Sequence, residues 1–204
     1  MAITTWPTGP TWQPREMRFG ASTPKSGFAA FFSGNNQTIS HLSDRLRCTL
    51  MLPPCGAADG EQREAWLLGL ASSGDWVTLG HLQRAAEPRG TLRGLPTVSA
   101  NTAAGARTLP ITTTAEASLT AGDMLQVGSQ LIMARTTTVA NGSGAMSLPL
   151  SLPLVADVAS GAAVVWQSPV GRFQLEGASA AGIDVGWGRF SWQAAVDISL
   201  LQVP

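Results

Sequence analysis

Aromatic residues are absent from a stretch of 89 residues in the middle of the chain, between Trp76 and Trp166. Eight of the thirteen aromatic residues precede this stretch, and the other five follow it. Aromatic side chains supply much of the apolar area of a protein core, so one core shared along the whole chain would draw on rings throughout. The distribution therefore predicts a host domain built from both ends of the chain, with an aromatic-free module inserted into it.

Segments rich in proline and glycine mark the expected joints, at residues 87–96 before the module and 167–171 after it. An insertion of this kind is tolerated where the two joints lie side by side on the surface of the host. We predict a discontinuous host domain of residues 1–95 and 167–204, and an inserted all-β module of residues 96–166.

The host domain is expected to be mainly β with one packed helix. Strict alternation of apolar and polar residues over 46–52 is typical of a half-buried strand, and we expect further strands at 17–21, 27–32, 76–79, 172–175 and 188–203. A helix is predicted over about 59–72, with Asp59 as its N-cap, Gln62 completing a capping box and Gly74 ending it. The alternation in 188–203 places Phe190, Trp192 and Ala194 on the same face as Val196 and the apolar residues that follow.

The module shows several short strand patterns, separated by turn sequences. We expect strands at 108–112, 124–127, 131–138, 145–151 and 162–166. The Asn-Gly pair at 141–142 is a strong hairpin signal. Short strands at regular spacing predict a small β-barrel or sandwich.

Charge is sparse and balanced, with 13 basic and 13 acidic residues and a formal net charge of zero. This composition lacks the basic field of duplex-binding proteins, so we expect no sequence-specific binding of nucleic acid. No apolar run is long enough for a membrane helix and the first residues do not form a secretion signal, so we expect a soluble protein made in a cytoplasm. Residues 96–169 carry only five charges, and we expect a neighbour to cover part of the module.

No residue pattern predicts a catalytic, metal or cofactor site. Cys48 and Cys55 form neither a C-x-x-C motif nor a disulfide framework, and we expect one buried thiol and one loop thiol. His41 and His81 have no carboxylate or cysteine at metal-ligand spacing, so both are expected to be ordinary histidines.

Two other functions stay open at this point. A hydrolase would need Ser40, His41 and Asp44 to converge, or a carboxylate pair such as Asp184 with Glu176 or Asp59 with Glu61, and only a measured separation decides this. A sugar-binding module would use exposed rings, for which the candidates are Trp6, Trp12, Trp187 and Trp192. We favour the interpretation that these rings fill the host core or a subunit interface.

The order of these pieces resembles a known family. Residues 45–53 form an alternating strand that ends in Leu-Pro, 61–70 carry a Glu-x-x-Ala-Trp-Leu type of helix, and 73–79 form a short return strand with Trp76. In the module, 89–94 lead to 121–128 and then to 141–144, as in modules common in phage tail genes. From about Phe19 onward the chain is similar to the distal tail (baseplate) proteins of long-tailed bacteriophages, which are built on the β-sandwich of the tail tube with one packed helix.

This resemblance implies a structural virion protein and no enzymatic activity. Such proteins form a hexameric ring at the tail tip, which joins the tail tube protein to the hub and fibre or receptor-binding parts and surrounds the DNA channel. The expected location is the virion, after synthesis in the cytoplasm of the host bacterium. The low charge fits permanent assembly, and so does the use of arginine over lysine, because arginine is enriched and lysine depleted in interfaces. A carbohydrate-binding or adhesion module of a phage or bacterial surface assembly remains the alternative.

Overall fold

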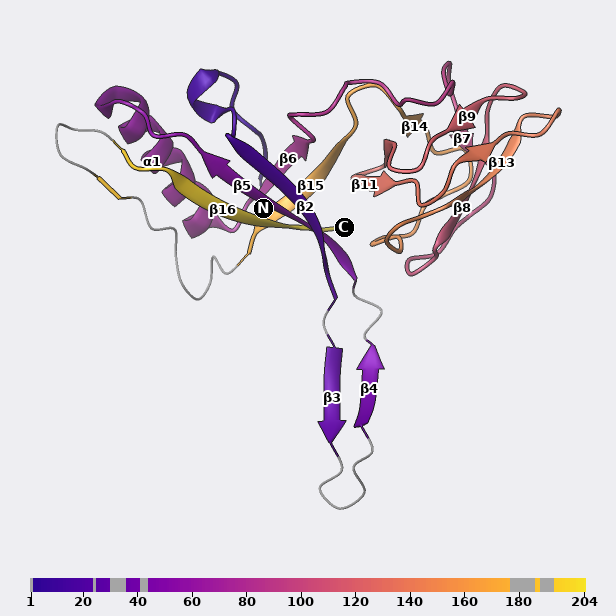
Figure 1. The fold of residues 1–204 in the computed structure, drawn as a ribbon, viewed down its shortest axis with the longest axis horizontal. Coiled ribbons are helices and arrows are strands. Elements are labelled where there is room, and N and C mark those ends of the chain that lie inside the picture. The colour runs from indigo at the N-terminus through magenta and orange to yellow at the C-terminus, as the bar shows by residue number, and fades with distance from the viewer. Residues whose placement is uncertain (1, 24, 30–35, 41–43, 177–185, 188–192) are drawn as a thin grey trace.

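The computed structural model describes residues 2–23, 25–29, 36–40, 44–176, 186–187 and 193–204, with residues 25–29 and 36–40 described by their backbone. Within these residues the fold is mainly β, with a single α-helix and five sheets (Figure 1). The prediction of a mainly β fold with one packed helix is confirmed. None of the sheets in the described part of the chain closes into a barrel.

The largest sheet has six strands and is built from both ends of the chain. Their order is β1 (Ile3–Thr5), β6 (Trp76–Gly80), β15 (Val170–Leu175), β16 (Val196–Gln202), β5 (Arg45–Leu52) and β2 (Glu16–Ser22). β1 runs parallel to β6, and all other neighbours are antiparallel. Figure 1 shows a separate antiparallel hairpin of β3 (Lys25–Ala29) and β4 (Asn36–Ser40) that projects away from this sheet.

Alternation along the strands decides which face of the sheet is buried. In β5, Leu46, Cys48, Leu50 and Leu52 are buried, as predicted, whereas Arg47 between them is exposed. β16 repeats the pattern from Val196 onward. The prediction that its alternation begins at residue 188 is wrong for Ala194, which precedes the strand and is exposed; Phe190 and Trp192 lie outside the described residues.

The helix α1 (Ala57–Ser73) packs against the buried face through Leu67 and Leu70. The predicted cap is wrong: the helix begins two residues earlier, Gly56 occupies the N-cap without a side-chain bond, and Asp59 lies inside the first turn. An acid in the first turn still favours the helix through the macrodipole. The predicted end is confirmed, because Gly74 takes the left-handed conformation (φ 63°) that glycine adopts without strain.

The middle of the chain forms short sheets with a second hydrophobic cluster. The first of these sheets is β11 (Gln130–Met133), β10 (Met124–Val127) and β14 (Val164–Val165), the second is β12 (Thr138–Val139) with β9 (Ser118–Leu119), and the third is β13 (Ala145–Pro149), β8 (Thr108–Thr112) and β7 (Thr97–Val98). The cluster runs from Leu92 to Val164 and is separate from the cluster of the six-stranded sheet.

Several of the predicted strands match, and one divides. The bounds of β8 and β10 are the predicted ones. The predicted strand 131–138 splits into β11 and β12, because the chain leaves β10 after Met133, bridges to Leu150 at Ala134 and then pairs with β9. β1, β7 and β9 have two or three residues each and carry no pattern that the sequence could show.

The two clusters meet where β10 and β11 lie against β15. Met124 and Leu131 belong to the cluster of the six-stranded sheet. The Arg172 amide donates to the Ser129 carbonyl at 2.8 Å, and a Cβ on Gly171 would lie 2.8 Å from the Leu131 Cβ. A glycine in β15 therefore allows the close approach of the middle sheets to the terminal one.

Candidate functional site

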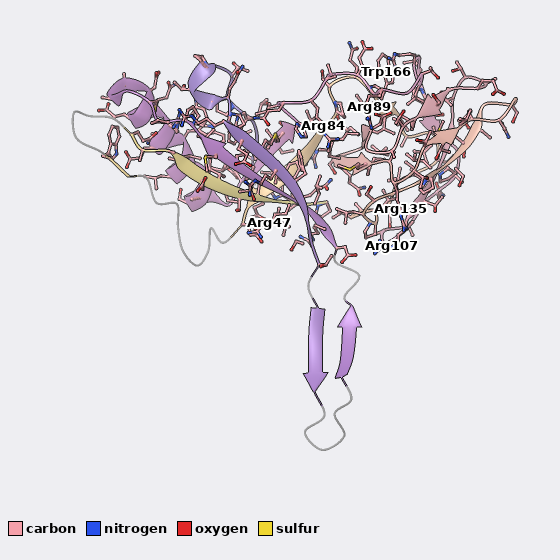
Figure 2. The ribbon with its side chains drawn as sticks, in the orientation of Figure 1. Arg47, Arg84, Arg89, Arg107, Arg135 and Trp166 are labelled. Carbon is pink, nitrogen blue, oxygen red and sulfur yellow. The ribbon has the colours of Figure 1, made fainter. Side chains whose placement is uncertain are left out.

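A cleft of about 730 Å³ lies between the two parts of the fold. Its lining comes from three segments that the sequence separates widely: the loop 80–89 after β6, the turn 121–124 before β10, and the segment 166–170 before β15. In Figure 2 the labelled Arg84, Arg89 and Trp166 lie along this junction. The volume is in the range of small-molecule sites in proteins.

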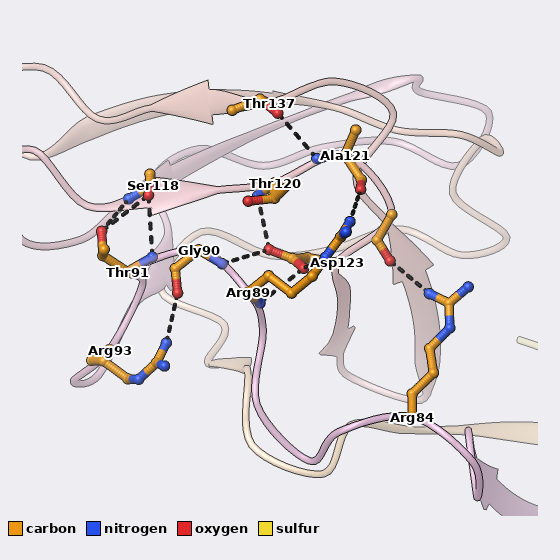
Figure 3. Close-up of polar contacts among 11 residues, drawn as sticks. Arg84, Arg89, Gly90, Thr91, Arg93, Ser118, Thr120, Ala121, Asp123 and Thr137 are labelled. Carbon is orange, nitrogen blue, oxygen red and sulfur yellow. Dashed lines mark hydrogen bonds and ion pairs between the residues drawn. The ribbon is translucent and has the colours of Figure 1, made fainter.

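Asp123 fixes the loop to the turn at the edge of the cleft (Figure 3). Its side chain is almost fully buried, and its carboxylate accepts hydrogen bonds from the backbone amides of Arg89 (3.0 Å), Gly90 (3.0 Å) and Thr120 (2.8 Å). The Arg89 Nε lies 3.6 Å from the same carboxylate. Three backbone donors and one ion-pair contact therefore surround this carboxylate, and its role is to hold the backbone.

Two arginines converge on the turn that Asp123 anchors. Arg84 Nη1 donates to the Gly122 carbonyl at 2.7 Å, and Arg89 Nη2 donates to the neighbouring Ala121 carbonyl. Both side chains are exposed to solvent. Within the described residues Arg84 forms no ion pair with a carboxylate. Two guanidinium groups are thus bound to the same turn, and each has N–H donors that these bonds do not use.

A third arginine lies over the ring of Trp166, a residue of the cleft wall. Arg93 pairs with Glu87 at 3.0 Å and lies over the Trp166 ring, with 5.0 Å from its Cζ to the ring centroid. The Trp166 indole N–H donates to the Gly94 carbonyl at 2.9 Å. The ring therefore has a fixed orientation in the wall of the cleft, and Glu87 has Arg93 as its ion-pair partner.

His81 also lines the cleft and packs against Phe19 of β2, with the ring centroids 5.1 Å apart. Burial, and to a lesser degree the nearby Arg84 guanidinium, lower the pKa of His81 below its ordinary value. Its ring is therefore neutral at pH 7. That His81 is an ordinary histidine stays a prediction, and the structure shows its ring packed against Phe19; His41 lies outside the described residues.

The proposed sugar-stacking rings are placed very differently from one another. Trp6 and Trp12 are 6% and 7% exposed and form a cluster of edge-on contacts with Trp66, so they fill the core as the favoured interpretation expects. Trp187 is 41% exposed, and its indole N–H donates to Glu64 at 3.0 Å. Trp192 lies outside the described residues.

The candidate catalytic groups are not brought together in the described residues. The triad cannot be placed, because His41 lies outside them and Ser40 is described by its backbone. Of the carboxylate pairs, Asp184 lies outside the described residues, and Glu176 pairs with Arg47. Asp59 and Glu61 are two apart on α1, a spacing that points side chains away from each other.

Both cysteines are free and buried. Cys48 lies in β5, where burial raises the pKa of its thiol to about 12. Cys55 follows the strand in a loop, as expected, yet it is buried because its backbone pairs with Gln193 in an isolated bridge. Neither position has the exposure of a reactive thiol.

The cleft residues were not predicted as a site. The sequence contains the two turns that form the edge of the cleft, Arg89-Gly90 and Gly122-Asp123. Nothing in the sequence shows that these two turns lie side by side in the fold. The described residues also contain no group of three or more His, Cys, Asp or Glu side chains that could hold a metal ion. Among them, no helix has both the length and the apolar character that crossing a bilayer requires.

In comparisons with known proteins, no family model and no curated protein matches the sequence.

Proposed function

We propose that the protein is a structural component of a bacteriophage tail tip. It forms a ring, expected to be hexameric, that joins the tail tube to the hub and receptor-binding parts and surrounds the DNA channel. It acts by assembly and has no catalytic role of its own.

The observation that carries this proposal is that the six-stranded sheet ends in two unlike strands. β1 forms one edge and β2 the other, and each has a hydrogen-bonded neighbour on one side only within the described residues. Open edges favour pairing with another chain. Because the two edges differ, pairing of β2 of one copy with β1 of the next is heterologous, and contacts of this kind generate rings where the rotation between copies closes.

The hairpin β3–β4 adds support for assembly. It continues from β2 and β5 and stands apart from the six-stranded sheet (Figure 1). A two-stranded hairpin on its own is at best marginally stable in water. Contact with a neighbouring subunit would stabilise it.

The buried polar side chains support a structural role as well. Asp123, Arg63 and Gln193 each bind backbone groups of their own chain. Polar side chains that are bound to the backbone in this way stabilise one arrangement of it and are not available for catalysis. We infer that these side chains serve the fold.

The edge pairing can be tested with two matched lysine substitutions. Ile3 on β1 is 51% exposed, and Leu68 on α1 is 47% exposed. A lysine on an edge strand opposes edge-to-edge pairing. We expect Ile3→Lys to shift the oligomer towards monomer in multi-angle light scattering, and Leu68→Lys to leave it unchanged. Equal oligomer masses for both variants and the wild type would contradict the edge model.

A carbohydrate-binding role is the second candidate, favoured by one observation. Trp187 is exposed and lies beside the Glu64 carboxylate, a combination of an apolar ring face and a hydroxyl acceptor. On this hypothesis, glycan-array binding is lost in Trp187→Ala and kept in Trp166→Phe. Absence of binding by the wild type would reject it.

A further inference from the structure

We propose that the cleft between the loop 80–89, the turn 121–124 and the segment 166–170 binds a small ligand that carries an oxyanion, such as a carboxylate or phosphate, on an apolar body. This inference does not depend on the tail-tip proposal. It rests on two positioned arginines, on the lack of a free acid beside them, and on the apolar wall behind them.

The arginines are held in place before any ligand arrives. Arg84 and Arg89 donate to the adjacent carbonyls of Gly122 and Ala121, and the Asp123 carboxylate fixes both the turn and the backbone of Arg89 (Figure 3). Each guanidinium has five N–H donors, so bonds to the carbonyls leave donors free on both. Arrangements that are fixed in advance reduce the entropy cost of binding.

The acids near the cleft already have partners within the chain. Asp123 accepts from three amides and lies 3.6 Å from Arg89 Nε. Glu87 pairs with Arg93 at 3.0 Å. This leaves the positive charge of Arg84 without a carboxylate partner in the described part of the chain. Charged hydrogen bonds from arginine to a carboxylate or phosphate are among the strongest in proteins.

Part of the remaining wall of the cleft is apolar. Met124, Pro169 and Val170 line it together with Trp166, whose ring is fixed by the bond to Gly94 and by Arg93. Because Arg93 lies over a face of the Trp166 ring, we expect the apolar body of the ligand to contact the edge of that ring and Val170. A ligand with an apolar body beside its anionic group would use both parts of the cleft.

The test compares benzoate with benzamide, two probes of the same shape that differ in charge. Titration followed by amide and indole NMR signals is expected to show saturable binding of benzoate, with shifts at Trp166 and Gly122, and at least tenfold weaker binding of benzamide. We expect inorganic phosphate to bind more weakly than benzoate, because it lacks the apolar body. Equal binding of benzoate and benzamide, or tighter binding of phosphate, would overturn the proposal.

Variants locate the binding in the cleft. Arg84→Gln removes a charge from an exposed side chain and is expected to weaken benzoate binding about tenfold, the usual effect of losing one charged hydrogen bond. Arg135→Gln removes an exposed charge elsewhere in the molecule and serves as the matched control (Figure 2). Circular dichroism checks that both variants fold. Unchanged affinity in Arg84→Gln, or equal weakening in Arg135→Gln, would refute the assignment.

Discussion

Single buried polar residues join segments of this protein that are far apart in the sequence. Arg63 on α1 is fully buried and donates to the carbonyls of Pro53 and Thr11, while its Nε has no hydrogen-bond partner among the described residues. Asp123 also joins distant segments, but as an acceptor: its carboxylate accepts hydrogen bonds from the amides of a loop more than thirty residues earlier in the chain. Removing either side chain would leave buried or partly buried backbone groups without partners, which costs more than the net value of the bonds.

Asp123 offers the clearest test at this scale. Asp123→Ala leaves the amides of Arg89, Gly90 and Thr120 unsatisfied, and we expect a loss of about 3 kcal/mol in the free energy of unfolding, measured by urea denaturation. Asp123→Asn keeps one carbonyl acceptor and should lose less. If alanine and asparagine were both tolerated without loss, the carboxylate would not be holding the loop.

At the scale of elements, prediction succeeded where one face of a strand or helix is buried. The alternation in β5 follows from a sheet with one apolar face, and the helix ends at Gly74 because glycine accepts the left-handed conformation. The helical start was missed because Gly56 caps without a side-chain bond, so no residue signals it. β1 depends on pairing with β6, more than seventy residues away, and local sequence cannot show such a partner.

The packing of α1 can be tested with two adjacent leucines. Leu67 is fully buried against the six-stranded sheet, whereas Leu68 is 47% exposed. We expect Leu67→Ala to lower the free energy of unfolding by about 2–5 kcal/mol, because it removes apolar contact and opens a cavity. Leu68→Ala changes the same side chain on the outer face and should alter stability by less than about 0.5 kcal/mol. Similar losses in both variants would contradict the assigned face of the helix.

At the scale of the whole molecule, both ends of the chain contribute strands to one sheet, and the middle has a hydrophobic cluster of its own. The first cluster uses large rings and the second uses aliphatic side chains, with Trp166 at its margin. The division into a host domain and an inserted module stays a prediction. The cleft could not be predicted in the same way. It depends on the close approach of Gly171 to Leu131, which brings the turn 121–124 to the loop after β6.

Whether the molecule assembles through its two sheet edges decides the proposed function. Electron microscopy of the purified protein, and of particles from cells that express it together with the genes beside its own, measures this directly. We expect closed rings of a single size with six copies, in which β2 of each copy lies beside β1 of the next. A protein that stays monomeric at every concentration and is missing from these particles would contradict this expectation.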